Sequence, residues 1–287
     1  MNKNSALISA ADLKSALDNP DTKLFDMRGT WSSPARSLPE DYAAGHIPSA
    51  VLIDWTTEFL EPDVEVGLAS VADFAQATAS FKNLGINRND LVVLYDDYHH
   101  MLAGRIWWAM RFWGFENVKV LNGGWKHWKA QGYETSTTES KPDIGSFVPV
   151  EHEQLRVSME EFLQIKNASC VIDARGKNGY AGNEDDERSG HIPGAINIPF
   201  SLTLDDKSGL FHDNETLISL FDRQIPNWRT ARLVSSCGAG YSGTVLMLAL
   251  LELGVESTLF DDSFSVWKRD LSRPVERGDG SASKSNL

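Results

Sequence analysis

The sequence predicts an α/β protein of two tandem domains, each with a mainly parallel sheet that carries helices on both faces. Three observations predict this fold class. The chain has 287 residues, about twice the size of a typical domain. Its two halves contain the same short motifs in the same order. In each half, short apolar runs alternate with amphipathic stretches, which is the pattern of strands and helices in a parallel sheet.

An internal duplication runs through almost the whole chain. Its anchors are an aspartate after an apolar run, a Gly-His-Ile-Pro motif, the residue after a second apolar run, and a tryptophan after a turn. The matching positions are Asp26 and Asp173, His46 and His191, Asp96 and Cys237, and Trp128 and Trp267, at offsets of 147, 145, 141 and 139. Because all four anchors keep their order and nearly keep their spacing, each half is predicted to be one domain.

The elements of the two halves are predicted at equivalent places. Each half holds two buried-strand runs and one apolar helix. These are residues 24–27, 91–95 and 104–112 in the first half, and 171–174, 232–236 and 243–253 in the second. Continuous apolar runs of this length are typical of strands buried on both faces.

The domain boundary is expected in a polar stretch after residue 134. Residues 135–150 contain Pro142, Gly145 and Pro149, a composition typical of a linker. We therefore expect a first domain over 1–134, a linker over 135–154, a second domain over 155–277 and a flexible tail over 278–287.

Composition excludes several classes of function. The formal net charge is −13, from 27 basic and 40 acidic residues, which disfavours binding to nucleic acid or to an anionic membrane. Two cysteines exclude a disulfide framework and leave no cysteine cluster for a metal. No run approaches the roughly 18 apolar residues of a membrane span, and the N-terminal residues lack a signal or transit pattern. A cytoplasmic protein is expected.

The reactive residue is expected to be Cys237, which lies between a predicted strand and an apolar helix. The loop after it reads Gly238-Ala239-Gly240-Tyr241-Ser242. Small residues let such a loop curl with its N–H groups inward, and the helix N-terminus adds partial positive charge. Both favour a thiolate, the species that attacks. Cys170 lies at a strand edge without such a loop and is expected to pack only.

These motifs together resemble the rhodanese family of sulfurtransferases, over about residues 7–277. The segments that carry the resemblance are the two Gly-His-Ile-Pro motifs, residues 120–125, the loop that begins at Cys237, and residues 264–267. In tandem members of this family the C-terminal domain is catalytic and the N-terminal domain has lost the cysteine. Asp96 stands at that position here, so the resemblance implies a catalytically silent first domain.

The resemblance also implies the reaction. Cys237 would take the sulfane sulfur of a small anionic donor, hold it as a persulfide, and pass it to a thiol such as thioredoxin or glutathione, or to cyanide. No external cofactor and no metal are implied. The neutral loop is similar to that of members that prefer 3-mercaptopyruvate over thiosulfate. Ala239 and Tyr241 depart from that group, because a hydroxyl and a valine are usual there.

Two further residues are candidates through the same resemblance. Asp54, eight residues after His46, matches an aspartate that relays a proton together with a loop hydroxyl. With Ala239 in place of that hydroxyl, Tyr241 or Ser242 is a substitute. Arg188, just before the second Gly-His-Ile-Pro motif, matches an arginine that binds the substrate carboxylate; the alternative is pairing with neighbouring acidic residues at the surface.

The repeated histidines and arginines are expected to be structural. His46 and His191 occupy the same motif in the domain with the cysteine and in the domain without it. A hydrogen bond that fixes the local loop explains this better than catalysis does. Arg28 and Arg175 each follow a strand-end aspartate and are expected to form ion pairs.

Three other functions remain as alternatives. The first is a rhodanese that prefers thiosulfate, and the second is a non-catalytic module of the same fold with a sulfur-binding or regulatory role. The third is a cysteine phosphatase of the related fold. That activity needs an arginine to grip the phosphate at the end of a longer loop, and position 243 is glycine, which argues strongly against it.

Overall fold

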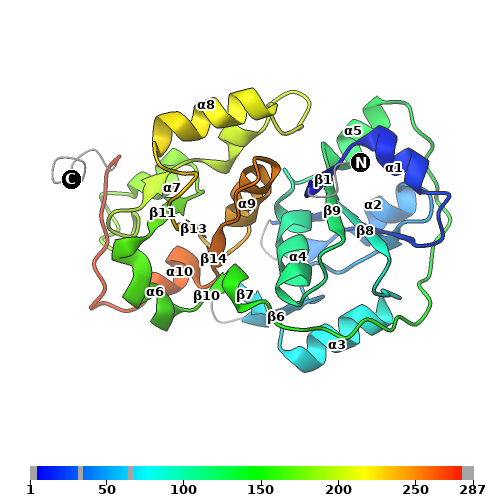
Figure 1. Cartoon of the computed structure of the whole chain (residues 1–287), viewed down its shortest axis with the longest axis horizontal. Helices are drawn as coiled ribbons and strands as arrows, with labels where there is room; N and C mark the ends of the chain where they lie inside the picture. The colour runs from blue at the N-terminus through cyan, green and yellow to red at the C-terminus, as the bar shows by residue number, and fades with distance from the viewer. Residues whose placement is uncertain (1–4, 32–34, 64–67, 280–287) are drawn as a thin grey trace. The chain divides into compact units, whose positions relative to one another are not determined.

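The computed structural model describes residues 5–31, 35–63 and 68–279, and the chain forms two compact units (Figure 1). The first unit reaches Glu153 and also includes Asp206–Phe211. The second contains Gln154–Asp205 and continues from His212. No helix among the described residues is long and apolar enough to span a bilayer.

The first unit is built on a five-stranded parallel sheet in the order β1-β9-β8-β2-β5. In that order the strands are Leu7–Ile8, Val118–Leu121, Leu91–Tyr95, Thr22–Asp26 and Val51–Leu52. The helices that flank it are α1 (Ala10–Ala16), α2 (Pro39–Ala44), α3 (Phe74–Asn83), α4 (Met101–Phe112) and α5 (Gly124–Ala130). Two antiparallel pairs, β3 (Gly29–Thr30) with β4 (Arg36–Ser37) and β6 (Leu60–Asp63) with β7 (Leu68–Val71), lie outside the sheet.

The second unit repeats this topology, with a parallel sheet in the order β10-β14-β13-β11-β12. In that order the strands are Arg156–Val157, Thr258–Phe260, Leu233–Ser236, Cys170–Asp173 and Ile196–Asn197. Its helices are α6 (Met159–Ile165), α7 (Lys177–Ala181), α8 (Asn214–Gln224), α9 (Ser242–Glu252) and α10 (Ser263–Trp267), with 3₁₀ turns at Glu153–Leu155, Lys166–Ala168 and Phe200–Thr203. The predicted fold class, two parallel-sheet α/β domains, is confirmed.

The central strands and the helices that follow them form the core of each unit. Residues 92–95 of β8 and all four residues of β13 are buried, as expected for parallel strands covered on both faces. Eight consecutive residues of α9, Gly243–Leu250, are also buried. A helix that is apolar on all sides is stable only when it is buried. The strand before Cys237 and the helix after its loop are therefore both held in the core.

The strand-end ion pair is the same in both units. Arg28 donates from Nη2 to Asp26 at 2.7 Å and to the carbonyl of Gly45 at 2.7 Å. Arg175 contacts Asp173 at 2.5 Å and the carbonyl of Gly190 at 2.7 Å. Each arginine therefore ties the end of a strand to the turn of a Gly-His-Ile-Pro motif, which confirms the structural role expected for both.

The two motif histidines also make matching contacts. His46 Nδ1 lies 2.8 Å from the carbonyl of Tyr42, and their rings stack at 3.8 Å. His191 Nδ1 lies 2.9 Å from the carbonyl of Tyr180, with rings stacked at 3.7 Å. Both imidazoles are buried and hold the motif against the preceding helix, as expected for a structural role.

The expected linker belongs to the first unit. Phe147 is buried against Phe81 and Phe115, with ring centroids at 4.6 and 5.1 Å. The backbone of this segment is also fixed, because Gly145 N–H donates to the carbonyl of Lys82 at 2.7 Å. The boundary between the units therefore falls between residues 153 and 154. Local composition does not reveal it, because the contacts that fix this segment join residues far apart in the sequence. Residues 280–287 of the expected tail lie outside the described residues.

A short segment, Asp206–Phe211, also packs in the first unit. Phe211 stacks on His100 with centroids at 5.0 Å, and Phe211 N–H donates to Asn122 Oδ1 at 2.9 Å. Nε2 of His100 donates to the carbonyl of Gly209 at 2.9 Å. A stretch of chain placed between two elements of the second unit thus completes the core of the first.

Candidate active site

Cys237 lies directly after β13, at the carboxyl end of a central strand. In open parallel sheets, ligands bind at this edge. The cysteine is 1% exposed. The loop that follows it leads into α9, which begins at Ser242. Gly238 and Ala239 are half-buried and form the accessible side of the loop.

The loop directs a backbone amide at the sulfur. Gly240 N–H donates to Cys237 Sγ at 3.0 Å. This geometry requires a sharp turn, and Gly240 supplies it with φ +82°, a conformation that glycine adopts without a steric penalty. An amide N–H aimed at a sulfur atom stabilises negative charge that develops there.

The first turn of α10 fixes the loop from the other side. Phe264 N–H donates to the carbonyl of Cys237 at 2.9 Å, and Ser265 N–H donates to that of Gly238 at 3.1 Å. The loop is therefore held at two of its carbonyls, while the Gly240 N–H donates to the sulfur.

Ser263 is a site residue that the sequence analysis missed. Its hydroxyl accepts from Cys237 N–H at 3.2 Å, donates to the carbonyl of Phe260 at 3.0 Å, and lies 3.9 Å from Cys237 Sγ. Ser263 is fully buried and has φ +51°, which costs a non-glycine residue about 1–2 kcal/mol. The repeat has Gly124 at this position, with φ +55°. A serine where the repeat uses a left-handed glycine is the signal that would have identified it.

Asp96 stands in the first unit where Cys237 stands in the second, and its carboxylate fills the equivalent loop. It is 1% exposed and accepts four backbone hydrogen bonds of 2.8–3.0 Å, from the amides of Tyr98, His100, Leu102 and Ala103. The position of its backbone is also equivalent, because Trp125 N–H donates to the carbonyl of Asp96 at 3.0 Å. The first unit thus keeps an anion cradle but occupies it with its own side chain.

Arg188 binds main-chain carbonyls at the end of α10. Nε donates to Lys268 at 2.9 Å, Nη1 to Arg273 at 2.9 Å and Nη2 to Asp270 at 3.0 Å. All three guanidinium nitrogens are therefore engaged, and with carbonyls rather than with the neighbouring carboxylates considered from the sequence. This favours a positioning role over the substrate binding expected from the sequence, and a substitution at Arg188 distinguishes the two roles.

Asp54 lies in the first unit, in the turn after β5. Its Oδ1 accepts from Thr56 Oγ1 at 2.6 Å, from Thr56 N–H at 3.0 Å and from Ser37 Oγ at 3.1 Å. The side chain is exposed. The relay function of Asp54 stays a prediction.

The two candidate substitutes for the missing loop hydroxyl differ in exposure. Tyr241 is 5% exposed, and its carbonyl accepts from Thr244 Oγ1 at 2.6 Å. Ser242 begins α9 and is half-buried. Ser242 is therefore the more accessible of the two.

Comparisons with known proteins agree with the duplicated architecture. A model of the rhodanese-like domain matches twice, over residues 9–131 and 158–270. SseB of Mycobacterium tuberculosis, provisionally named a thiosulfate sulfurtransferase, is 32% identical over 281 residues, which cover 95% of this chain and 97% of that protein. The 3-mercaptopyruvate sulfurtransferase of Escherichia coli is 28% identical over 94% of this chain and 97% of its own length. The crystal structure of E. coli SseA, a protein of that activity, superposes with a TM-score of 0.80 at 26% identity, covering 90% of this chain and 98% of SseA.

Proposed function

The chain belongs to the rhodanese family of sulfurtransferases, and from this premise we propose that it transfers a sulfane sulfur through a persulfide on Cys237, with 3-mercaptopyruvate preferred over thiosulfate as the donor. The observation that carries the proposal is the Gly240 N–H on Cys237 Sγ at 3.0 Å, at the carboxyl edge of the sheet. A cysteine sulfur that accepts a hydrogen bond from a backbone amide is suited to attack an electrophilic sulfur as a thiolate.

The proposed reaction has two displacements. In the first, Cys237 Sγ attacks the donor sulfur, a new S–S bond forms, and the bond from that sulfur to the donor breaks. With thiosulfate the electron pair leaves on sulfite; with 3-mercaptopyruvate it leaves on carbon as the enolate of pyruvate, which then takes a proton. In the second, a thiolate or cyanide attacks the outer sulfur, and the S–S electron pair returns to Cys237.

The donor preference follows from the charge of the loop. Residues 238–242 carry no basic side chain, and Arg175, which lies close to Gly238, is already paired with Asp173. A thiosulfate dianion would have little cationic compensation on leaving water. The 3-mercaptopyruvate monoanion requires less, but its enolate product needs a proton source. Asp54 with Ser242 or Tyr241 is the proposed relay.

The acceptor in this proposal is a small or protein thiol, such as glutathione or thioredoxin, with cyanide as an assay substitute. Both cysteines are free thiols in the structure. Thiols persist in reducing compartments, so a cytoplasmic location forms part of the same proposal.

The proposal is tested by steady-state sulfur transfer to cyanide with the two donors side by side. We expect a kcat/KM for 3-mercaptopyruvate at least about tenfold above that for thiosulfate, since one uncompensated charge costs more than about 1.4 kcal/mol in such a site. A preference for thiosulfate would contradict the argument from loop charge. Activity with neither donor would favour the non-catalytic module.

Replacement of Arg188 by alanine is expected to destabilise the second unit without weakening donor binding. Three hydrogen bonds from a charged group are lost, so the free energy of unfolding should fall by about 1–3 kcal/mol, while KM should change by less than about twofold. Arg188→Lys, which keeps the charge but not the three-way contact, should also be destabilised. A large rise in KM at unchanged stability would restore the substrate-binding role predicted from the sequence.

A further inference from the structure

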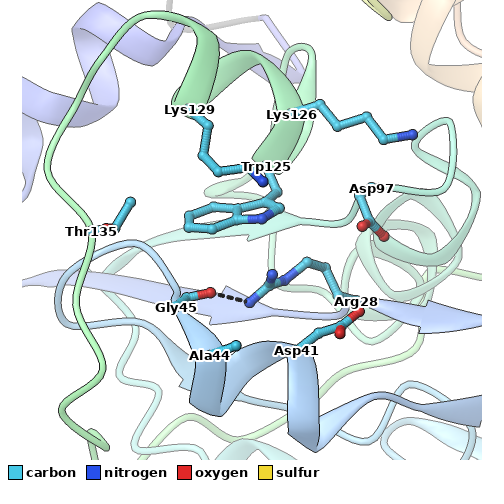
Figure 2. A pocket seen from close by; sticks show the side chains of 9 residues that line it. All are labelled: Arg28, Asp41, Ala44, Gly45, Asp97, Trp125, Lys126, Lys129 and Thr135. Carbon is cyan, nitrogen blue, oxygen red and sulfur yellow. Dashed lines mark hydrogen bonds between the residues drawn. The ribbon is translucent and has the colours of Figure 1, made fainter.

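A cavity of about 390 Å³ lies in the first unit, between α2 and α5 and beside Asp97, the residue that follows Asp96 (Figure 2). Its size falls within the roughly 300–1,000 Å³ of small-molecule sites. The lining residues come from the end of β2, from α2, from the loop after β8 and from α5. They are Arg28, Asp41, Ala44, Gly45, Asp97, Trp125, Lys126, Lys129 and Thr135.

The floor of the cavity is fixed. Arg28 is 3% exposed, is held by Asp26 and by the carbonyl of Gly45, and lies with Cζ 4.5 Å from the centre of the Trp125 ring. Figure 2 shows the guanidinium between Gly45 and the indole. Asp26 neutralises the charge of Arg28 at 2.7 Å. The floor is therefore a rigid aromatic surface without a net charge.

The helix α5 forms a positive wall. Lys126 and Lys129 lie three residues apart and so project from the same side of this helix. Lys129 Nζ lies 5.1 Å from the centre of the Trp125 ring. Among the described residues neither lysine forms an ion pair with a carboxylate at 4.0 Å or less. In a chain with a formal charge of −13, two such lysines at one cavity leave positive charge available to a ligand.

Two aspartates provide negative charge on other sides of the cavity. Asp41 projects from α2, across the indole from the lysines, and Asp97 lies in the loop after β8 (Figure 2). Burial and the neighbouring Asp96 raise the pKa of Asp97, against the opposite effect of Arg28 and Lys126. A cationic group bound beside Asp97 would stabilise its charged form. With Arg28 and Asp26 paired, two lysines face two aspartates.

In the second unit the equivalent positions carry other side chains, with Gly238 in place of Asp97 and Ser265 in place of Lys126. Arg188 stands two residues before Gly190 and reaches the carbonyls that follow α10. The residue two positions before Gly45 is Ala43, whose side chain is too short to make that bridge. The charged lining of the cavity is thus not repeated at these positions of the second unit.

We propose that this cavity binds a small zwitterion of the α-amino acid class. The carboxylate of the ligand would lie against Lys126 and Lys129, and its ammonium group against Asp41 and Asp97. A simple anion would leave the aspartates without a partner, and a simple cation would leave the lysines without one. A ligand with both charges compensates both walls, and the remainder of the cavity accommodates its side chain beside Ala44 and Thr135.

Calorimetric titration of the full chain with L-methionine tests this proposal, because methionine has no sulfane sulfur to transfer. The matched probes are 4-(methylsulfanyl)butanoate, which lacks the ammonium group, and 3-(methylsulfanyl)propylamine, which lacks the carboxylate. We expect methionine to bind at least about tenfold more tightly than either analogue, which corresponds to about 1.4 kcal/mol. Absence of methionine binding, or an analogue that binds equally well, would overturn the proposal.

Variants then locate the binding. Lys126→Ala combined with Lys129→Ala, and separately Asp41→Asn, should each weaken methionine binding at least about fivefold. Lys82→Ala and Asp18→Asn, which change exposed residues of the same unit outside the cavity, should leave it unchanged, with Tm measured for all four. If the cavity variants bind methionine as well as the controls do, the assignment is wrong. Sulfur transfer is not the readout, so this result is separate from the donor assay.

Discussion

Replacement of Cys237 by serine is expected to abolish sulfur transfer from both donors, with a fall in kcat/KM of at least about a thousandfold. A serine hydroxyl is hardly ionised near neutral pH and forms no persulfide, so the first displacement has no nucleophile. The change from sulfur to oxygen is small, and the hydrogen bonds at the backbone of residue 237, to Ser263 Oγ and Phe264 N–H, do not involve the side chain. The fold should therefore remain.

The matched control for this variant is Cys170→Ser. Cys170 is half-buried on β11, and burial raises the pKa of its thiol to about 11, so it stays protonated at neutral pH and reacts slowly. We expect this variant to keep activity within about twofold. Mass spectrometry after incubation with the donor should find the added sulfur on the peptide of Cys237 alone. Measurable turnover by Cys237→Ser, or a persulfide on Cys170, would contradict the assignment.

Replacement of Asp96 by alanine is expected to cause a large loss of stability in the first unit. The carboxylate accepts four amides at 2.8–3.0 Å while 1% exposed, and its removal leaves these donors without an acceptor. A buried unpaired amide costs about 1–3 kcal/mol, and water recovers part of this, so we expect a total loss of about 3–5 kcal/mol. Denaturation in urea, followed by circular dichroism, measures it as an earlier transition of one unit.

Two controls test the physical reason for that loss. Asp97→Asn changes the neighbouring half-buried carboxylate, which forms no hydrogen bond within the described part of the chain, and should shift stability by less than about 1 kcal/mol. Sulfate should partly restore the stability of Asp96→Ala, because an oxyanion can occupy the vacated amides. If alanine at position 96 has no effect, the four hydrogen bonds contribute little and the cradle is not the reason for the aspartate.

Features fixed by local pattern could be predicted from the sequence, and features fixed by distant contacts could not. The sheet order repeats because the apolar runs and the Gly-His-Ile-Pro motifs repeat, and the roles of Arg28 and Arg175 followed from their places after strand ends. The position of Arg188 on three carbonyls depends on residues 80 to 85 positions away. Phe147 belongs to the first unit through contacts with Phe81 and Phe115. These contacts could not be predicted from the polar, proline-containing composition of its segment.

The site itself shows the same division. The cysteine, the glycine loop and the following helix are adjacent in the chain, so their pattern predicts their geometry. Ser263 reaches Cys237 from 26 residues away, and only its replacement of a glycine in the repeat marks it. Asp54 and the loop are separated by most of the chain, and the proposed relay between them rests only on the resemblance to a family.

The contacts of Asp206–Phe211 have a consequence for the order in which the chain is synthesised and folded. Domains commonly fold as they leave the ribosome, the N-terminal one first. Here His100 finds the carbonyl of Gly209 and the ring of Phe211 only after about half of the second unit has been translated. The first unit can collapse earlier, around its own sheet, but its final packing has to wait, so completion of the first unit is coupled to synthesis of the second.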